Sequence, residues 1–187
     1  LALSTLRSSN ASVYSFIGLG AMARATLDCL IATNPDSVLN IRLMRYKDQA
    51  ERIAAEYASH PNVRFTIVDT VEAFADGSDV IVSCITDADG LVVDDTSMFK
   101  PGVLVVPVHT RGFQNCDTIF DRVVADDRAH VEGFRYFNDF RDFSQLEDVL
   151  KGNRPGRTSD TERILAYNIG LGLHDVLFAT KILEIIQ

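Results

Sequence analysis

Short apolar runs alternate with helical patterns along most of the chain. The runs are nearly continuous rather than alternating, as is typical of parallel strands that helices cover on both faces. We expect strands at Val13–Ile17, Val38–Met44, Val63–Val68, Val80–Cys84, Val103–Val108 and Arg122–Ala125. Because each strand–helix–strand crossover is right-handed, the alternation predicts an α/β fold with a doubly wound, mostly parallel sheet of the Rossmann type.

Helical patterns fill the intervals between these strands and dominate the end of the chain. We expect helices at Ala21–Thr33, Asp48–Ser59, Val71–Ala75 and Phe143–Leu150. After a loop at 151–157, the spacing of Ser159 and Glu162 is that of a capping box, which predicts that a long C-terminal helix begins there. Residues 1–12 are expected to form the end of a preceding helix or a linker.

Composition narrows the class of protein. With 187 residues, 47% of them hydrophobic and 24% charged, the chain can build an ordinary globular core. Its net charge of -8 argues against nucleic acid or an anionic membrane surface as partner. Charged residues interrupt Ile164–Gln187, the most apolar long stretch, so we expect no bilayer span. Three distant cysteines without a C-x-x-C pair predict buried, reduced thiols in a cytoplasmic protein, and no metal site.

A glycine turn follows the first expected strand and opens the first helix, with the sequence Gly18-Leu19-Gly20-Ala21-Met22-Ala23. Gly18 permits the tight turn, Gly20 lets a pyrophosphate approach the backbone, and Ala23 lets helix and strand pack closely. The phosphates would lie on the helix N-terminus. We therefore expect residues 13–150 to bind a dinucleotide; a glycine turn that binds something else, or nothing, is the alternative. Met22 would cover the diphosphate or fill the core.

The end of the second strand bears on the choice of cofactor. No acid stands there to hold a ribose 2′-hydroxyl, whereas Arg45 and Lys47 bracket an aromatic residue. An arginine suits a 2′-phosphate, so NADP(H) is favoured over NAD(H). In the alternatives, Arg45 and Lys47 belong to a solvated helix start capped by Asp48, or Asp48 contacts the ribose and NAD(H) is bound.

Two further strand ends should face the same crevice, because ligands of open parallel sheets bind outside the carboxyl ends of the strands. Thr86 follows the fourth strand and could reach the ribose on the nicotinamide side. His109 and Arg111 follow the fifth strand and could transfer a proton and bind a carboxylate, respectively. Alternatively, His109 bonds a loop carbonyl and Arg111 pairs with Asp117.

The glycine turn, extended by Arg24, resembles the G-x-G-x-x-A-R turn of the ornithine cyclodeaminase/mu-crystallin family. The segments 156–162 and 168–175 are similar to that family's closing G-R-x-x-D-x-E…S-x-G-x-A-x-x-D motif. The resemblance implies a two-domain, dimeric subunit whose N-terminal α/β part binds the amino-acid substrate. The chain starts without Met on a helical pattern, so we expect a piece of a longer product in which 151–187 returns toward that part. Alone, it is expected to be inactive.

The resemblance also implies residue roles. Ala21 and Met22 would contact the diphosphate, Arg45 the adenosine ribose, and Asn168 the cofactor in place of the family's serine. The full expected cofactor set is Gly18, Gly20, Ala21, Met22, Arg45, Lys47, Thr86, Val108, His109, Thr110 and Asn168. His109 and Arg111 are the expected catalytic residues, and Arg111 and Ile169 are expected to border the substrate.

One departure from the family pattern concerns the catalytic aspartate of cyclodeaminases. Arg111 occupies its position, which disfavours deamination by the aspartate route. The resemblance therefore favours an NAD(P)-dependent oxidoreductase acting on an amino or imino acid, of the imine reductase or amino-acid dehydrogenase type. An ornithine cyclodeaminase-type lyase and a non-catalytic NADP-binding module remain the alternatives.

Overall fold

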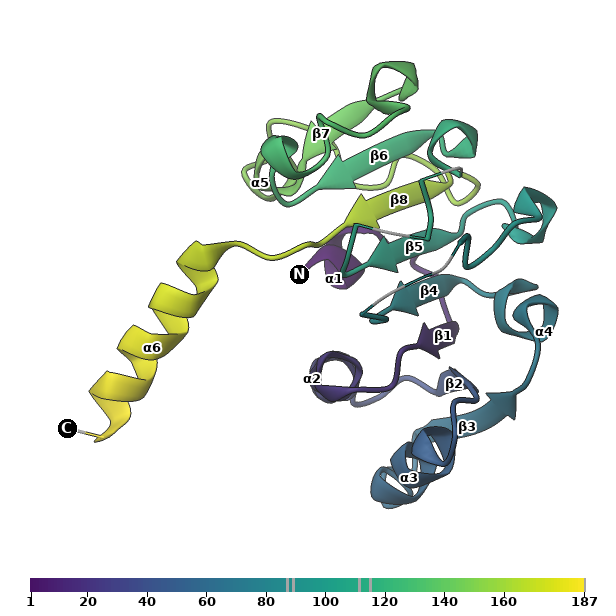
Figure 1. Cartoon of the computed structure of the whole chain (residues 1–187). Helices are drawn as coiled ribbons and strands as arrows, with labels where there is room; N and C mark the ends of the chain where they lie inside the picture. The colour runs from purple at the N-terminus through teal and green to yellow at the C-terminus, as the bar shows by residue number, and fades with distance from the viewer. Residues whose placement is uncertain (87, 89, 111, 115, 187) are drawn as a thin grey trace.

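The computed structural model describes residues 1–86, 88, 90–110, 112–114 and 116–186. Within these residues, eight strands form one sheet in the order β3-β2-β1-β4-β5-β8-β6-β7, and every pairing is parallel (Figure 1). The strands are β1 (Val13–Ile17), β2 (Leu39–Met44), β3 (Val63–Val68), β4 (Val80–Ser83), β5 (Leu104–Pro107), β6 (Arg122–Ala125), β7 (Phe143–Gln145) and β8 (Ile164–Tyr167). The strand order reverses between β1 and β4, and open parallel sheets generally bind their ligands outside the carboxyl ends of the strands at such a point.

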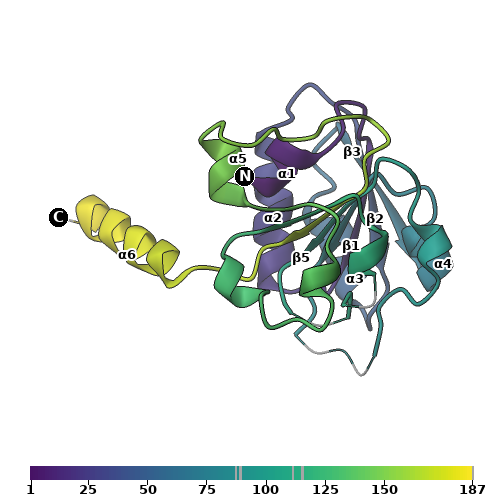
Figure 2. The same cartoon turned by 90° about the horizontal axis from the view of Figure 1, so that it is seen from above.

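Helical segments cover both faces of the sheet (Figure 2). One face carries α1 (Ala2–Leu6), α2 (Ala21–Ala32), α3 (Gln49–Glu56) and α5 (Leu146–Leu150). The other carries α4 (Val71–Ala75) and four 3-10 turns, η1 (Thr96–Met98), η2 (Asp117–Ile119), η3 (Arg128–His130) and η4 (Phe137–Asp139). The doubly wound α/β architecture expected from the sequence is therefore confirmed.

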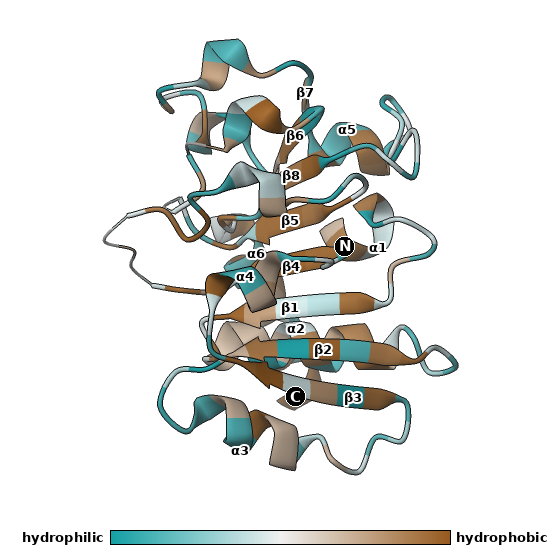
Figure 3. Ribbon diagram, turned by 90° about the vertical axis from the view of Figure 1, so that its right-hand side faces the viewer, coloured by the Kyte–Doolittle hydropathy of each residue, from teal (hydrophilic) through white to brown (hydrophobic). Residues whose placement is uncertain are grey.

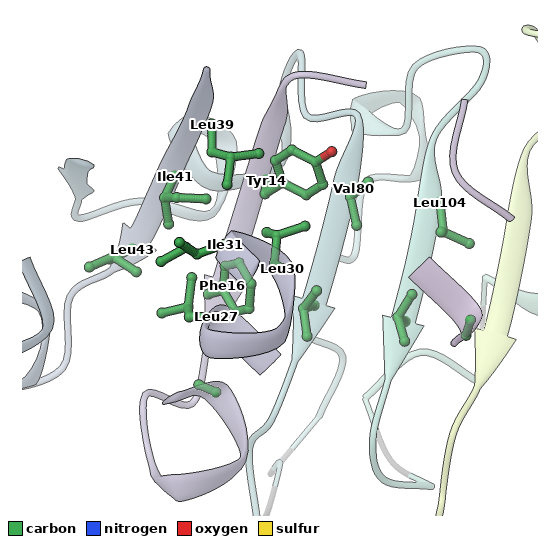
Figure 4. Packing of buried hydrophobic residues seen from close by; sticks show 14 of the residues in the cluster. Tyr14, Phe16, Leu27, Leu30, Ile31, Leu39, Ile41, Leu43, Val80 and Leu104 are labelled. Atoms are coloured by element: carbon green, nitrogen blue, oxygen red, sulfur yellow. The ribbon is translucent and has the colours of Figure 1, made fainter. Parts of the chain in front are cut away.

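The core on the first face explains the position of α2. Its buried residues Ala23, Leu27, Leu30 and Ile31 recur at helical spacing and so form one apolar stripe. Figure 4 shows Leu27, Leu30 and Ile31 packed against Tyr14 and Phe16 of β1 and against the leucines and isoleucine of β2. Burial of each large apolar side chain contributes about 1.5–3 kcal/mol. This packing fixes the start of α2 relative to the end of β1.

Strands near the centre of the sheet are apolar throughout, whereas those at the β3 end alternate. All four residues of β4, β5 and β8 are buried, and the ribbons of these strands are largely brown in Figure 3. In β2, buried Leu39, Ile41 and Leu43 alternate with partly exposed residues. Strand β2 is therefore held in register by one buried face, since a shift by one residue would expose all three.

Six expected strands and the helices at Val71–Ala75 and Ala21–Thr33 are confirmed to within one or two residues. The helix expected at Asp48–Ser59 is shorter and ends at Glu56. The helix expected at Phe143–Leu150 is wrong in its first three residues, because Phe143–Gln145 pairs with β6 as strand β7. Cross-strand pairing outweighs the local helical pattern there.

The helix start expected at Ser159 is also wrong. Ile164–Tyr167 forms strand β8, which lies between β5 and β6, and helix α6 begins only at Gly172. The Glu162 carboxylate accepts a hydrogen bond from Thr158 N at 2.6 Å instead of closing a capping box. The four apolar residues of β8 are buried and paired with strands on both sides, which is more favourable than placing them in the first turn of an exposed helix.

Buried charges hold the chain that leads into β8. The side chain of Arg122, in β6, is 5% exposed and lies 3.1 Å from Asp142 and 3.2 Å from Glu162, both measured from nitrogen to carboxylate oxygen. Its Nη1 also donates to the carbonyl of Pro155 at 2.8 Å and to that of Gly156. We call Arg122, Asp142 and Glu162 the Arg122 cluster. It ties β6 to the segments on either side of the 151–157 loop.

Helix α6 (Gly172–Ile186) stands apart from the sheet (Figures 1 and 2). No residue of this helix is buried. Its exposed large apolar side chains are Leu173, Val176, Leu177, Phe178, Ile182, Leu183, Ile185 and Ile186. Among the described residues, no helix has both the length and the apolarity that a membrane crossing requires.

Candidate functional site

The glycine turn joins β1 directly to α2, as the sequence predicts. Gly18 has φ +78°, a left-handed conformation that favours glycine. A Cβ at this position would lie 2.4 Å from Cys84 C and from Ile85 N, in the segment that follows β4. Gly18 therefore serves the close approach of two backbone segments at the point where the strand order reverses.

Gly20 has the opposite surroundings. It is the N-cap of α2 with φ -86°, which other residues can adopt, and apart from its two chain neighbours no described residue has an atom within 4 Å of a Cβ placed there. The space in front of Gly20 is thus open, and a side chain at this position would project into it. This is the geometry that a closely approaching ligand requires.

The first turn of α2 presents backbone donors to that open space. The first hydrogen bond of the helix runs from Arg24 N to Gly20 O at 3.2 Å, so the amides of Ala21, Met22 and Ala23 precede the intrahelical ladder. The first turn contains no acidic residue. Met22 is 58% exposed, so it does not fill the core. Open amides and the positive end of the helix dipole fit a diphosphate.

Arg45 directly follows β2 and Asp69 directly follows β3. Because Met44 pairs with Val68 in the parallel ladder, these two residues come next to each other at the carboxyl edge. Arg45 Nε donates to Asp69 Oδ1 at 2.5 Å, and Arg45 also pairs with Glu51 of α3. The guanidinium that the sequence assigned to a ribose 2′-phosphate is therefore already bound to two carboxylates.

Lys47 and Asp48 complete the turn between β2 and α3. Lys47 has φ 52°, and its Nζ lies 5.1 Å from the ring centroid of exposed Tyr46. Asp48 is the N-cap residue of α3, but its side chain makes no capping hydrogen bond and instead pairs with Arg52 at 2.7 Å. The solvated helix start considered from the sequence is thus present, without the aspartate cap.

The ends of β4 and β5 lie side by side, as expected. Val108 N donates to Ser83 O at 2.9 Å, and Ser83 Oγ lies 2.6 Å from His109 Nε2. Ser83 is fully buried and His109 is partly exposed, so the hydroxyl fixes the orientation of the imidazole. Thr86 is exposed and Thr110 is half-buried near the same edge. Arg111, the second expected catalytic residue, lies outside the described residues.

Asn168 and Ile169 follow β8 and reach the same edge from its other side. Asn168 N donates to Pro107 O at 3.0 Å, whereas its side-chain amide donates to Ala166 O at 2.9 Å. Ile169 packs against the core of the second face. Gly170 N donates to Asp126 Oδ2 at 2.5 Å, so the carboxylate at the end of β6 holds the strand-to-helix connection in place.

A cavity of about 350 Å³ lies between α1, α2 and the sheet, away from the glycine turn. Val108 and Asn168 are the two expected site residues in its lining, together with Cys29, Leu30 and Thr33 of the C-terminal part of α2 and the residue after it. The glycine turn, Arg45 and His109 do not line it. The open amides of Ala21, Met22 and Ala23 do not line it either and lie at the carboxyl edge of the sheet.

Asp117 forms a buried polar pair with Tyr167. It is fully buried in η2, and its Oδ1 accepts a hydrogen bond from Tyr167 Oη, at the end of β8, at 2.8 Å. No described residue forms a hydrogen bond with its Oδ2. Burial raises the pKa of Asp117 from 3.8 to about 6, and the Tyr167 hydrogen bond only partly opposes this.

This pKa predicts a pH dependence of stability. Because the pKa of Asp117 is higher in the folded chain than in the unfolded chain, the protonated carboxyl group favours the folded chain. This contribution to the free energy of unfolding is fully present below pH 3.8 and is lost as the pH rises through about 6. The difference corresponds to about 3 kcal/mol. We expect Asp117→Asn to be more stable than the wild type at pH 8, by up to about 3 kcal/mol, and similar to it at pH 4.

Urea unfolding at the two pH values measures this difference. The exposed Asp139→Asn replacement is the control and should follow the wild type at both. If Asp117→Asn were more stable than the wild type by the same amount at pH 4 and at pH 8, the gain in stability would not come from ionisation of the Asp117 carboxyl group.

The expectation of buried cysteines is only partly met. Cys116 is buried and Cys84 partly buried, but Cys29 is exposed on α2, and no disulfide joins any two of these cysteines. Burial raises the pKa of Cys116 to about 12 and that of Cys84 to about 11, which makes both thiols poor nucleophiles.

Sequence reasoning missed the partners of the expected site residues: Glu51, Asp69, Ser83 and Asp126. Asp69 carried a signal, since it directly follows a strand of the same length as β2 and so ends beside Arg45. Asp126 likewise directly follows β6. Ser83 had no such signal, because a serine that ends an apolar strand is compatible with many roles.

Comparisons with known proteins bear on the family and on the fold of the chain. A model of the ornithine cyclodeaminase/mu-crystallin family matches residues 1–187. Among curated proteins, the nodulation efficiency protein NfeD of Rhizobium meliloti is 28% identical over 178 residues, which cover 91% of this chain and 54% of that protein.

Two similar solved structures share the fold. The Δ1-pyrroline-2-carboxylate reductase of Thermococcus litoralis, in complex with NADH and L-proline, superposes with a TM-score of 0.79 at 17% identity, covering 96% of this chain and 59% of the other. An archaeal alanine dehydrogenase dimer with bound NAD gives 0.76 at 18% identity, covering 96% and 58%. The chain thus spans somewhat more than half the length of these proteins.

Proposed function

Because the chain belongs to the ornithine cyclodeaminase/mu-crystallin family, we propose that it is the cofactor-binding part of an NAD(P)-dependent oxidoreductase that acts on an amino or imino acid. The reductase and dehydrogenase with similar folds were solved with NADH or NAD, and the reductase also with L-proline. These complexes support a nicotinamide dinucleotide as the cofactor and a small amino or imino acid as the substrate.

The observation that carries the proposal is the open space in front of Gly20. Three amides at the start of α2 precede its hydrogen-bonded ladder, and beyond the chain neighbours of Gly20 no described atom lies within 4 Å of a Cβ placed there. Gly20, Ala21 and Met22 would hold the diphosphate there, with Gly18 shaping the turn. Arg45 and Lys47 stand on the β2 side of this turn, where the adenosine ribose would lie.

The β4–β5–β8 side of the crevice would then face the nicotinamide. When bound, the nicotinamide supplies or accepts a hydride at the carbon that bears the substrate nitrogen. Thr86, Val108, Thr110 and Asn168 would border the ring and its ribose. His109, oriented through Nε2 by Ser83 Oγ, is the described residue suited to move a proton there. Arg111 is proposed to bind the substrate carboxylate.

Helix α6 is proposed to pack on a second, substrate-binding domain. Its eight large apolar side chains are exposed, and such a surface in a folded protein is normally covered. The similar structures are longer than this chain, which leaves room for such a domain. We also propose that the protein works in the cytoplasm, where disulfides are rare, and as a homodimer; its cysteines form no disulfide.

Titration of the chain with NADH tests the proposal. We expect saturable binding that enhances nicotinamide fluorescence, and ADP-ribose should displace NADH because it carries the same diphosphate. No turnover of L-alanine or L-proline is expected from the chain by itself. Absence of NADH binding would refute the assignment. Binding without turnover by the full-length protein on any amino or imino acid would identify a non-catalytic module.

A further inference from the structure

Two carboxylates neutralise the arginine beside the proposed ribose position. Arg45 Nε lies 2.5 Å from Asp69 Oδ1, and Glu51 pairs with Nη1 of the same guanidinium. These contacts come from two different elements, since Asp69 ends β3 and Glu51 belongs to the first turn of α3. An arginine that grips a phosphate uses two parallel N–H donors, and here a donor on each side of the guanidinium is occupied.

The neighbouring charges do not restore a positive field. Lys47 and Arg52 are the other cations in this turn, and Asp48 neutralises Arg52 at 2.7 Å. Residues 45–52 together with Asp69 thus contain three carboxylates and three cations, so their charges cancel. Glu72, three residues beyond Asp69 in the first turn of α4, adds another negative charge. A phosphate monoester carries a charge of about -1.5 to -2 at pH 7 and would be repelled by these carboxylates.

A ribose 2′-hydroxyl has no such difficulty. It is uncharged, and it can donate a hydrogen bond to a carboxylate, which is the role an acid usually has at the end of the second strand. We infer that Asp69 and Glu51, by occupying Arg45, set the chain's preference for NAD(H) over NADP(H). This reverses the preference that Arg45 and Lys47 suggest in the sequence, and it rests on the proposed dinucleotide function.

Binding measurements with both nucleotides test the inference. The wild-type chain is titrated with NADH and with NADPH while nicotinamide fluorescence is followed. We expect NADH to bind at least about tenfold more tightly. Binding of neither nucleotide would overturn the proposed function together with this inference. Equal or tighter binding of NADPH, which Lys47 could produce, would overturn the inference alone.

The double variant Glu51→Gln, Asp69→Asn removes both carboxylates with little change in shape. Exposed ion pairs contribute little to stability, so this variant should fold. We expect its NADPH affinity to rise about tenfold or more and its NADH affinity to stay within about threefold of the wild type. Adding Arg45→Ala to the double variant should abolish the gain for NADPH.

A control with the same change in net charge separates a local effect from a general one. Asp36→Asn with Glu147→Gln removes two exposed carboxylates, the first before β2 and the second in α5. The ratio of NADPH to NADH affinity should remain that of the wild type. An equal rise in NADPH affinity in both double variants would overturn the specific role of Glu51 and Asp69, as would no change in either.

Discussion

Replacement of Gly20 by alanine should weaken NADH binding about tenfold or more, which corresponds to about 1.4 kcal/mol of binding free energy. The alanine methyl group would stand in the open space before the first amides of α2, where the diphosphate is proposed to lie. The phosphates would be displaced from those donors and from the positive end of the helix. Titration with NADH by nicotinamide fluorescence measures the loss.

The folded chain should tolerate this replacement. Gly20 has φ -86°, and a Cβ there meets no atom within 4 Å, so the free energy of unfolding should change by less than about 1 kcal/mol. Urea unfolding of the variant checks this. NADH binding as tight as in the wild type would show that the turn does not hold the diphosphate.

Gly18→Ala is the matched control, because the same substitution two residues earlier should reduce stability, whereas Gly20→Ala should reduce NADH binding. The left-handed φ of Gly18 costs a non-glycine residue about 1–2 kcal/mol, and the Cβ would lie 2.4 Å from two backbone atoms that cannot move aside easily. We expect a loss of stability of about 3 kcal/mol or more. A stable Gly18→Ala chain would contradict the close approach of the turn to the segment after β4.

The parts of the fold that depend on local pattern could be predicted from the sequence. The glycine turn, the stripe of Leu27, Leu30 and Ile31 in α2, and the apolar strands carry their periodicity in adjacent residues. The position of Arg45 and His109 at the same edge of the sheet could also be predicted, because parallel strands bring their carboxyl ends to one edge. These features are enough to propose a nucleotide site without any knowledge of long-range contacts.

Features that depend on distant partners could not be predicted. Strand β8 is inserted between β5 and β6, although about forty residues follow β6 before it begins. The sequence spacing of Ser159 and Glu162 suits a helix start, but Glu162 is committed to Arg122, which lies far away in the chain. Likewise, the free arginine suggested by the β2 end is occupied by Asp69 from β3. In the last two cases a charged residue pairs with one that is distant in the sequence, and only Asp69, at the end of the neighbouring strand, left a signal that could have been read.

The Arg122 cluster should therefore be the polar contact on which the second half of the sheet most depends. Arg122→Met would remove the cation between Asp142 and Glu162 and leave the Glu162 carboxylate, 8% exposed, without its partner. The carbonyls of Pro155 and Gly156 would also lose a donor. We expect a loss of about 3–5 kcal/mol in the free energy of unfolding, measured with urea.

Two further variants distinguish the buried charge from the lost side chain. Adding Glu162→Gln to Arg122→Met removes the stranded charge and should restore at least about 1 kcal/mol, since much of the penalty comes from an unpaired buried ion. Arg141→Met, which breaks the exposed pair with Asp121 at 3.4 Å, should cost less than about 1 kcal/mol. If Arg122→Met costs no more than Arg141→Met, the cluster does not hold β8 in the sheet. If it costs several kcal/mol, the proposed placement of Asn168 and Ile169 beside the cofactor depends on a contact at the opposite, amino-terminal end of β8.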